Sequence, residues 1–133
     1  MLINKMFYST GKLHYSNDPY KLIVEVDQNI SDYYRSFIPK YIQVNKQMFN
    51  AHISVVRKEV PMYLEYWEKY EGKSLDFEYE NFIYNDETYY WLNAYSEELE
   101  RIRLELGLSG LSEITRSPDG RHKFHITICN LKN

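Results

Sequence analysis

Cysteine is almost absent from this sequence, and its scarcity excludes several kinds of structure. The single cysteine, Cys129, has no partner for an intramolecular disulfide, and the chain contains neither a Cys-x-x-Cys pair nor a cysteine and histidine cluster with metal-ligand spacing. We therefore expect a reducing, cytoplasmic setting and neither a metal nor another cofactor. Cys129 is predicted to be a compact residue packed within a strand rather than a nucleophile.

Long hydrophobic runs and a basic charge balance are absent as well. No apolar stretch approaches the length of a membrane span, and segment 1–12 lacks the apolar centre and cleavage pattern of a signal peptide. The formal net charge of −3 provides no broad basic field for long nucleic acid. The sequence thus predicts binding to neither membranes nor long nucleic acid, and it is compatible with a small phosphorylated ligand. It leaves the oligomeric state undetermined.

Tyrosine, in contrast, is abundant, with 14 of the 133 residues. The length suits one domain, because neither half alone has enough chain to bury a core, and the content of 44% hydrophobic and 26% charged residues is typical of a globular protein. Tyrosine favours half-buried strands and also provides a flat face with a polar tip. The excess therefore fits a β-rich fold and a site that holds flat ligands.

Alternating patterns and turn residues predict the order of the elements. The predicted elements of the first half are a strand over 20–27, a helix over 30–38 with Ser31 as N-cap and Pro39 at its end, a strand over 51–58, and a helical turn from Pro61 to Gly72. Those of the second half are two strands within 74–95 joined at Asn85-Asp86, a helix over 97–106 with Ser96 as N-cap and Gly107 after its end, a loop over 110–121, and a strand over 122–131.

The two halves look alike, since each ends in a strand that contains a histidine. This order predicts an α+β fold with two pseudo-symmetric lobes of antiparallel strands flanked by helices, approximately residues 1–72 and 73–133. Together the lobes form one domain.

Two short motifs stand in the paired strands, His52-Ile53-Ser54 and His125-Ile126-Thr127. Because side chains at i and i+2 of a strand share a face, each strand would present a histidine and a hydroxyl in front while the isoleucine points into the core. If the two fronts line one cleft, one neutral imidazole accepts a proton and the other, protonated, donates to a leaving oxygen. The motif hydroxyls, Ser54 and Thr127, would bind the non-bridging oxygens of a phosphate.

The two remaining histidines are set apart from the motif histidines, His52 and His125. The triplet 14–16 has the motif spacing, but it runs directly into the turn 17–19, so we predict that it lies outside the site and that replacing His14 has little effect. His122 has an aromatic residue where the motifs have a hydroxyl and is not a candidate. A single histidine in a strand is more often a hydrogen-bonded structural residue than a functional one. The functional interpretation is favoured here only because His52 and His125 stand in matching strands.

The two motifs, separated by about half the chain, resemble the His-x-Ser/Thr motifs of the two-histidine (2H) phosphoesterase superfamily. The longer segments 10–27, 52–59, 89–108 and 117–132 further resemble the bacteriophage branch of this superfamily that contains the anti-CBASS cyclic-nucleotide phosphodiesterases. The likeness covers nearly the whole chain from Gly11 onward.

The resemblance implies a bilobal fold with a concave, sheet-lined cleft, and metal-independent cleavage of 3′-5′ bonds in cyclic di- and trinucleotides to linear products. Such enzymes remove the second messengers of CBASS antiphage immunity, so the implied location is the cytoplasm of the bacterial host. On that model a ribose 2′-hydroxyl attacks the adjacent phosphorus, one motif histidine takes its proton, and the other protonates the leaving 5′-oxygen. The sequence does not assign the two roles.

Candidate residues for binding the rest of the substrate are less constrained by the sequence. Trp91 alternates with apolar residues in its strand, and Tyr20 follows the turn before the first predicted strand, so each is a candidate platform for a nucleobase or a half-buried sheet aromatic. By strand alternation Lys58 and Lys123 fall on the faces that carry the motif histidines, where either adds positive charge near the phosphate.

Two alternatives stay open. The same chemistry would serve an enzyme that opens 2′,3′-cyclic phosphates at RNA ends or cleaves 2′-5′ bonds, although the acidic charge balance disfavours long RNA. A protein of another class, a cyclic-nucleotide sponge, would use the histidines only to bind phosphate.

Overall fold

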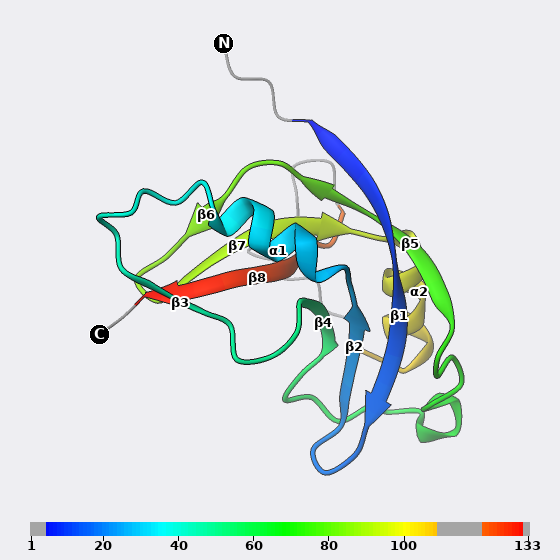
Figure 1. Ribbon diagram of the computed structural model, residues 1–133. Helices are drawn as coiled ribbons and strands as arrows, with labels where there is room; N and C mark the ends of the chain where they lie inside the picture. Colours follow the sequence, from blue (N-terminus) through cyan, green and yellow to red (C-terminus); the bar gives the residue numbers. More distant parts are fainter. Residues whose placement is uncertain (1–4, 109–120, 132–133) are drawn as a thin grey trace.

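The computed structural model describes residues 5–108 and 121–131. These residues form eight strands, two α-helices and one 3₁₀ helix, shown in Figure 1. The strands are β1 (Met6–Ser16), β2 (Lys21–Glu25), β3 (Val44–Lys46), β4 (His52–Val56), β5 (Ser74–Glu80), β6 (Tyr84–Asn85), β7 (Tyr89–Tyr95) and β8 (Phe124–Leu131), and the helices are α1 (Gln28–Arg35), η1 (Leu64–Tyr66) and α2 (Glu97–Glu105). The predicted loop over 110–121 lies almost entirely outside the described residues.

All the strands belong to one antiparallel sheet that closes on itself. Its order is β3-β8-β4-β2-β1-β5-β7-β6, and an additional pairing of β7 with β8 joins six of these strands into a barrel. The α+β class is thereby confirmed, but the strands do not separate into the two predicted lobes. β1 pairs with both β2 and β5, and β8 pairs with both β4 and β7, so strands from the two halves of the chain join in one sheet.

The strand that joins the halves, β1, is absent from the sequence prediction. Segment 6–16 has little alternation of polar and apolar residues, and its glycine argues against a strand. The structure explains why position 11 is glycine: a Cβ there would lie 2.5 Å from Val24 Cγ1 and 2.6 Å from the Glu25 carbonyl oxygen. Glycine therefore lets β1 approach β2 closely enough to pair.

Both ends of α2 agree with the sequence prediction. The Ser96 Oγ accepts a hydrogen bond from the Leu99 N–H at 3.3 Å, and Gly107 follows the helix with φ of 77°. The start of α1 differs, because Asp27 is the N-cap and its Oδ1 accepts from the Asn29 N–H at 2.9 Å. Ser31 instead lies buried within the helix and donates from Oγ to the Ile128 carbonyl at 3.3 Å, which ties α1 to β8.

Two further elements differ in extent from the prediction. The helix predicted over 30–38 spans Gln28–Arg35 and is followed by turns, so it ends before the expected proline. The segment from Pro61 to Gly72 contains only the short η1 and further turns, and Glu68 within it has a φ of 68°, which a continuous α-helix does not allow.

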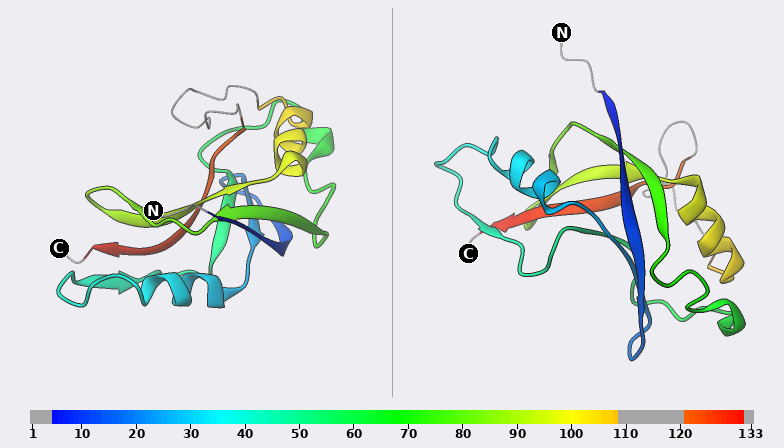
Figure 2. Two further views of the ribbon diagram at one scale, coloured as in Figure 1. Left: turned by 90° about the horizontal axis from the view of Figure 1, so that it is seen from above. Right: turned by 45° about the vertical axis from the view of Figure 1, so that its right-hand side comes forward.

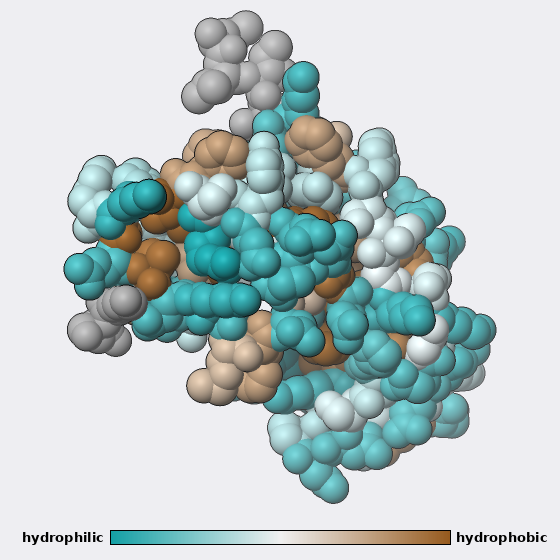
Figure 3. Space-filling model, in the orientation of Figure 1, coloured by the Kyte–Doolittle hydropathy of each residue, from teal (hydrophilic) through white to brown (hydrophobic). Residues whose placement is uncertain are grey.

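The apolar core lies on the face of the sheet that the helices cover. Figure 2 shows α1 and α2 lying apart, over different parts of the sheet. Ile53 of β4 and Ile126 of β8 are register partners and are both fully buried. The surface seen in Figure 3 is mostly hydrophilic, with hydrophobic residues gathered beside α1 and over the segment between β3 and β4. None of the helices among the described residues is long and apolar enough to cross a membrane.

Candidate active site

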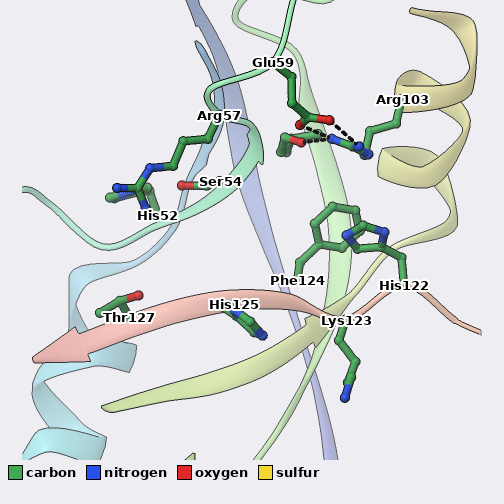
Figure 4. Close-up of a pocket in the computed structure, with 11 residues that line it drawn as sticks. His52, Ser54, Arg57, Glu59, Arg103, His122, Lys123, Phe124, His125 and Thr127 are labelled. Atoms are coloured by element: carbon green, nitrogen blue, oxygen red, sulfur yellow. Dashed lines mark hydrogen bonds and ion pairs between the residues drawn. The ribbon is translucent and has the colours of Figure 1, made fainter. Parts of the chain in front are cut away.

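The two motif strands are neighbours in the sheet. Ile53 pairs with Ile126 in antiparallel register, and continuing that register places His52 across from Thr127 and Ser54 across from His125. Because the isoleucines are buried, the flanking motif residues occupy the opposite, uncovered face. Figure 4 shows His52 and Ser54 on one side of an open space and His125 and Thr127 on the other. The predicted meeting of the two motifs is present in the structure.

Two hollows meet at the motif residues. The first has a volume of about 380 Å³ and extends toward α2, and the second has a volume of about 720 Å³ and extends over β1, β2 and β7. We call the part that both share the floor, the rest of the first the helix-side arm, and the rest of the second the aromatic arm. Both hollows are lined by His52, Ser54, Arg57, His125 and Thr127.

His52 is held in one orientation by the backbone. Its Nδ1 lies 2.7 Å from the Asn50 carbonyl oxygen, and a carbonyl only accepts, so Nδ1 carries a hydrogen and donates it. The Nε2 atom is therefore the one that can exchange a proton with a ligand on the floor. The fixed ring resembles the oriented histidines of other acid-base sites.

His125 lies in a different electrostatic setting. Solvent reaches the ring through the cleft, but surrounding protein atoms desolvate it, and this desolvation, together with the positive charge of Lys123, lowers the pKa of His125 below its ordinary value. The ring also contacts Trp91, with ring centroids 5.3 Å apart. At neutral pH His125 is thus mainly the neutral imidazole, which is the proton-accepting form.

A bulge follows each motif and changes which residues face the hollow. Ile23 pairs with Ser54 and Leu22 with Val56, so Val55 is an extra residue on β4. In the same way Trp91 pairs with Thr127 and Tyr90 with Cys129, so Ile128 is an extra residue on β8. Beyond each extra residue the alternation of faces is inverted. The two strands share this irregularity at corresponding positions.

These inversions correct the sequence prediction for Lys58 and explain the position of Cys129. Lys58, expected on the site-facing side, lines neither hollow and is exposed, and its φ of 57° breaks the strand. Arg57 takes its place on the floor. Cys129 would share the face of His125 by simple alternation, but it is fully buried on the core side, where desolvation raises the pKa of its thiol to about 11. Its predicted role as a packed residue agrees with this position.

The helix-side arm contains an ion pair that the sequence did not indicate. Arg103 of α2 donates to both carboxylate oxygens of Glu59 at 2.8 and 2.9 Å, and also to the Val55 carbonyl at 2.7 Å. The bulge frees this carbonyl from the strand ladder, and the arginine satisfies it. Hydrogen bonding by Arg103 holds the pKa of Glu59 below its ordinary value, so the pair is charged at neutral pH.

His122, rejected as a candidate from the sequence, also lines the helix-side arm. Its ring stacks on Phe124 with centroids 4.1 Å apart, and its Nδ1 makes no hydrogen bond to the described residues. Desolvation, with smaller effects of Arg103 and His125, lowers the pKa of His122 to about 4. No spacing in the sequence signals this position, because it depends on how the start of β8 packs against α2.

Of the residues predicted to bind the rest of the substrate, Lys123 and Trp91 line the hollows, whereas Tyr20 and Lys58 do not. Lys123 lines the helix-side arm, and Trp91 lines the aromatic arm. Tyr20 lines neither hollow and instead packs edge-on against Trp67, with centroids 5.2 Å apart. The aromatic arm also contains Tyr15, Phe49 and Tyr89.

His14 is placed differently from its prediction as a residue outside the site. It belongs to β1, which runs into a turn at 17–20 as expected, but it lines the aromatic arm. Its Nδ1 lies 3.0 Å from Glu71 Oε2, and its Nε2 lies 3.6 Å from Glu25 Oε2. The His14 ring thus faces two carboxylates, whereas the motif histidines face the floor.

The described residues contain no group of three or more His, Cys, Asp or Glu side chains that could hold a metal ion. The floor instead offers two imidazoles, two hydroxyls and a guanidinium, which are groups that bind and protonate oxyanions. Comparison of the chain with models of known protein families, with curated proteins and with solved structures finds no match.

Proposed function

We propose that this protein is a metal-independent phosphodiesterase of the two-histidine type that cleaves 3′-5′ bonds in cyclic di- and trinucleotides and so counters CBASS immunity in the cytoplasm of a phage-infected bacterium. The observation that carries the proposal is the meeting of the two His-x-Ser/Thr motifs on one floor. The bulge that follows each motif supports the pseudo-symmetry that such a family implies.

The geometry supports different roles for the motif histidines. His125, neutral at working pH, takes the proton of a ribose 2′-hydroxyl while the 2′-oxygen forms a bond to phosphorus. The bond from phosphorus to the 5′-oxygen breaks, and the Nε2–H of protonated His52 donates to that oxygen. The hydrogen bond from His52 Nδ1 keeps Nε2 directed for this step. Attack by water on the resulting 2′,3′-cyclic phosphate completes a linear product that ends in a phosphate.

The motif hydroxyls bind the phosphate during these steps. Ser54 and Thr127 belong to different strands and lie diagonally to each other on the floor, so their O–H groups approach the two non-bridging oxygens from different directions. Hydrogen bonds of this kind hold phosphorus in line with the attacking oxygen and stabilise the charge that develops on the phosphate.

The two arms support a substrate with nucleosides on both sides of the cleaved phosphate. The aromatic arm contains Trp91 and Tyr89, whose rings offer stacking faces for a nucleobase. The helix-side arm leaves room for a further part of the ligand beyond the floor. A 2′,3′-cyclic phosphate at an RNA end would occupy only one arm and the floor, so the extended hollow favours the cyclic oligonucleotide.

The direct test is incubation of the purified protein with cyclic dinucleotides in EDTA, followed by chromatography of the products. We expect linear products that end in a phosphate. Intact cyclic dinucleotide would refute the proposal, and bound but uncleaved nucleotide would favour the sponge. Opening of nucleoside 2′,3′-cyclic phosphates alone would favour the RNA-end enzyme.

A further inference from the structure

The two motif histidines differ in how their rings are held. The ring of His52 is fixed by the hydrogen bond from its Nδ1 to a backbone carbonyl. The ring of His125 makes no hydrogen bond or ion pair with the described residues, and solvent reaches it through the cleft. A general base must direct a lone pair at the proton that it accepts, so a contact of another kind has to orient this ring.

That contact comes from the neighbouring strand β7. Asn93 is the register partner of His125, and Trp91 is the register partner of Thr127, so these β7 side chains share the face of the motif residues. The rings of Trp91 and His125 have centroids 5.3 Å apart and planes inclined by 45°. Figure 4 shows the His125 ring extending from β8 toward β7. The indole is therefore the wall against which the imidazole packs.

Trp91 is itself held in place from two sides. Its Nε1–H donates to Asn93 Oδ1 at 3.2 Å, and its ring stacks on that of Tyr84, its partner in β6, with centroids 6.2 Å apart. The Tyr84 hydroxyl donates in turn to Glu80 Oε2 at 2.8 Å. Asn93 is only 5% exposed and lines neither hollow. Because a buried amide costs free energy unless it is hydrogen-bonded, its bond to the indole indicates a specific task.

We propose that Trp91 and Asn93 are positioning residues that hold the His125 ring in the orientation in which it takes the proton of the ribose 2′-hydroxyl. The inference rests on the proposed function, and it gives Trp91 a task besides stacking on a nucleobase. Asn93 fixes the indole through its N–H, and the indole restricts the imidazole and keeps water from one side of it. A backbone carbonyl orients the ring on one motif strand, and an aromatic wall orients the ring on the other.

Removing the indole should change the titration of His125. Desolvation, more than the charge of Lys123, lowers the pKa of His125, and the indole is one of the groups that shield the ring. In Trp91→Ala water reaches that side of the ring, so the pKa of His125 should rise toward its ordinary value. The variant leaves unchanged the other titratable groups that line the hollows beside the ring, from its own segment, from the β4 side and from the β7 side: His122, Lys123, His52, Arg57, Asp86 and Tyr89.

NMR titration of the histidine rings measures this change without requiring turnover, and the His125 signal is identified by its loss in His125→Ala. We expect Trp91→Ala to raise the measured pKa of His125, and Trp91→Phe to raise it less, because phenylalanine restores a ring but not the N–H that bonds Asn93. The matched controls are Trp67→Ala and Trp67→Phe. Trp67 also donates from Nε1 to an asparagine, Asn17, at 2.8 Å, but it lines neither hollow. These controls should leave the His125 titration unchanged.

Kinetics with a cyclic dinucleotide separate positioning from substrate binding. Asn93→Leu removes the amide at similar volume, and position 93 does not reach the ligand because it lines neither hollow. We expect Asn93→Leu to lower kcat about tenfold or more at pH 7 and to change KM less than about threefold. Trp91→Phe should lower kcat as well, and it provides the same test if leucine at position 93 prevents folding.

Two results would overturn the positioning role. One is an unchanged titration of His125 in Trp91→Ala. The other is a raised KM with unchanged kcat in Asn93→Leu and Trp91→Phe, which would make Trp91 a binding surface only. Absence of turnover by the wild-type protein, together with the expected change in the His125 titration, would refute the enzyme and support the orientation of this ring by Trp91.

Discussion

At the scale of single residues, the motif histidines differ in what surrounds them. His52 is fixed through Nδ1 by a backbone carbonyl, whereas His125 is desolvated and lies beside Lys123. An acid and a base need different protonation states at the same pH, and the lowered pKa of His125 favours the proton-accepting state of that ring. We therefore expect the two histidines to have different roles in the proposed reaction, His125 as the base and His52 as the acid.

Replacing either motif histidine tests the paired mechanism. We expect His52→Ala and His125→Ala each to lower kcat by about 10²- to 10⁴-fold, because each change removes one proton-transfer step. The free energy of unfolding, measured in urea, should change by less than about 1 kcal/mol, since neither ring belongs to the buried core. Substantial turnover by either variant would rule out the pair.

His122 should make the stability of the protein depend on pH. Its pKa falls from 6.5 in the unfolded chain to about 4 in the folded protein. Because the folded state holds the neutral ring, this stability is fully present above pH 6.5, declines as the pH falls from 6.5 toward 4, and then levels off. The loss should be on the order of 2 kcal/mol, reduced from the full shift because solvent reaches part of the ring.

Urea unfolding of wild type and His122→Gln at pH 7 and pH 4.5 checks this dependence. Other groups also titrate over this range, but they are common to both proteins, so the difference between the two isolates His122. The stability of the wild type relative to the variant should fall at the lower pH. An unchanged difference would show that His122 is protonated as readily in the folded protein as in the unfolded chain.

At the scale of elements, the extra residue after each motif decides what the strand presents to the site. The bulge at Val55 brings Arg57 to the floor and frees a carbonyl for Arg103, and the bulge at Ile128 sends Cys129 into the core. Bulges are common near active sites because they redirect side chains without ending the strand. In this protein each bulge directly follows the motif, so the simple alternation of site-facing and core-facing side chains ends with the motif.

Arg103 should be the residue through which α2 stabilises the end of β4. Its side chain is 11% exposed and makes three hydrogen bonds, so we expect Arg103→Met to lower the free energy of unfolding by about 2 kcal/mol. Urea unfolding measures this loss.

Arg101→Met is the control for this change, because it alters an exposed arginine of the same helix. It should change the free energy of unfolding by less than about 0.5 kcal/mol. Similar destabilisation by the two variants would indicate a general effect of charge on α2 rather than the contact with β4.

At the scale of the whole molecule, closure of the sheet makes the two halves depend on each other. β1 belongs to the first half and pairs with β5 of the second, while β8 of the second half pairs with β4 of the first. Neither half contains all the partners of its own strands. The protein should therefore unfold as one cooperative unit.

Trp67 and Trp91 report on this cooperativity, because one lies in each half of the chain. The variants Trp67→Phe and Trp91→Phe each retain a single tryptophan. For each variant, the urea transition followed by tryptophan fluorescence should coincide with its transition followed by circular dichroism. Transitions that separate would show that the halves unfold independently, as two autonomous lobes would.

The motifs and the elements that carry them were predictable because they depend on local patterns. The period of two in 51–58 and 122–131 predicts strands with isoleucine inside and the polar residues outside, and Ser96 and Gly107 identify the ends of α2. The position of His14 was not predictable, because β1 lacks alternation and becomes a strand only by pairing on both sides. The two bulges were likewise unpredictable from the sequence.

The sequence by itself determined that two histidines and two hydroxyls stand on the polar faces of two strands, because side-chain direction in a strand depends only on spacing. The tertiary structure decided that these faces share one floor, that Arg57 rather than Lys58 joins them, and that Arg103 holds that segment in place. These features depend on register, on bulges and on contacts between segments far apart in the chain. Such contacts arise only when the whole sheet closes.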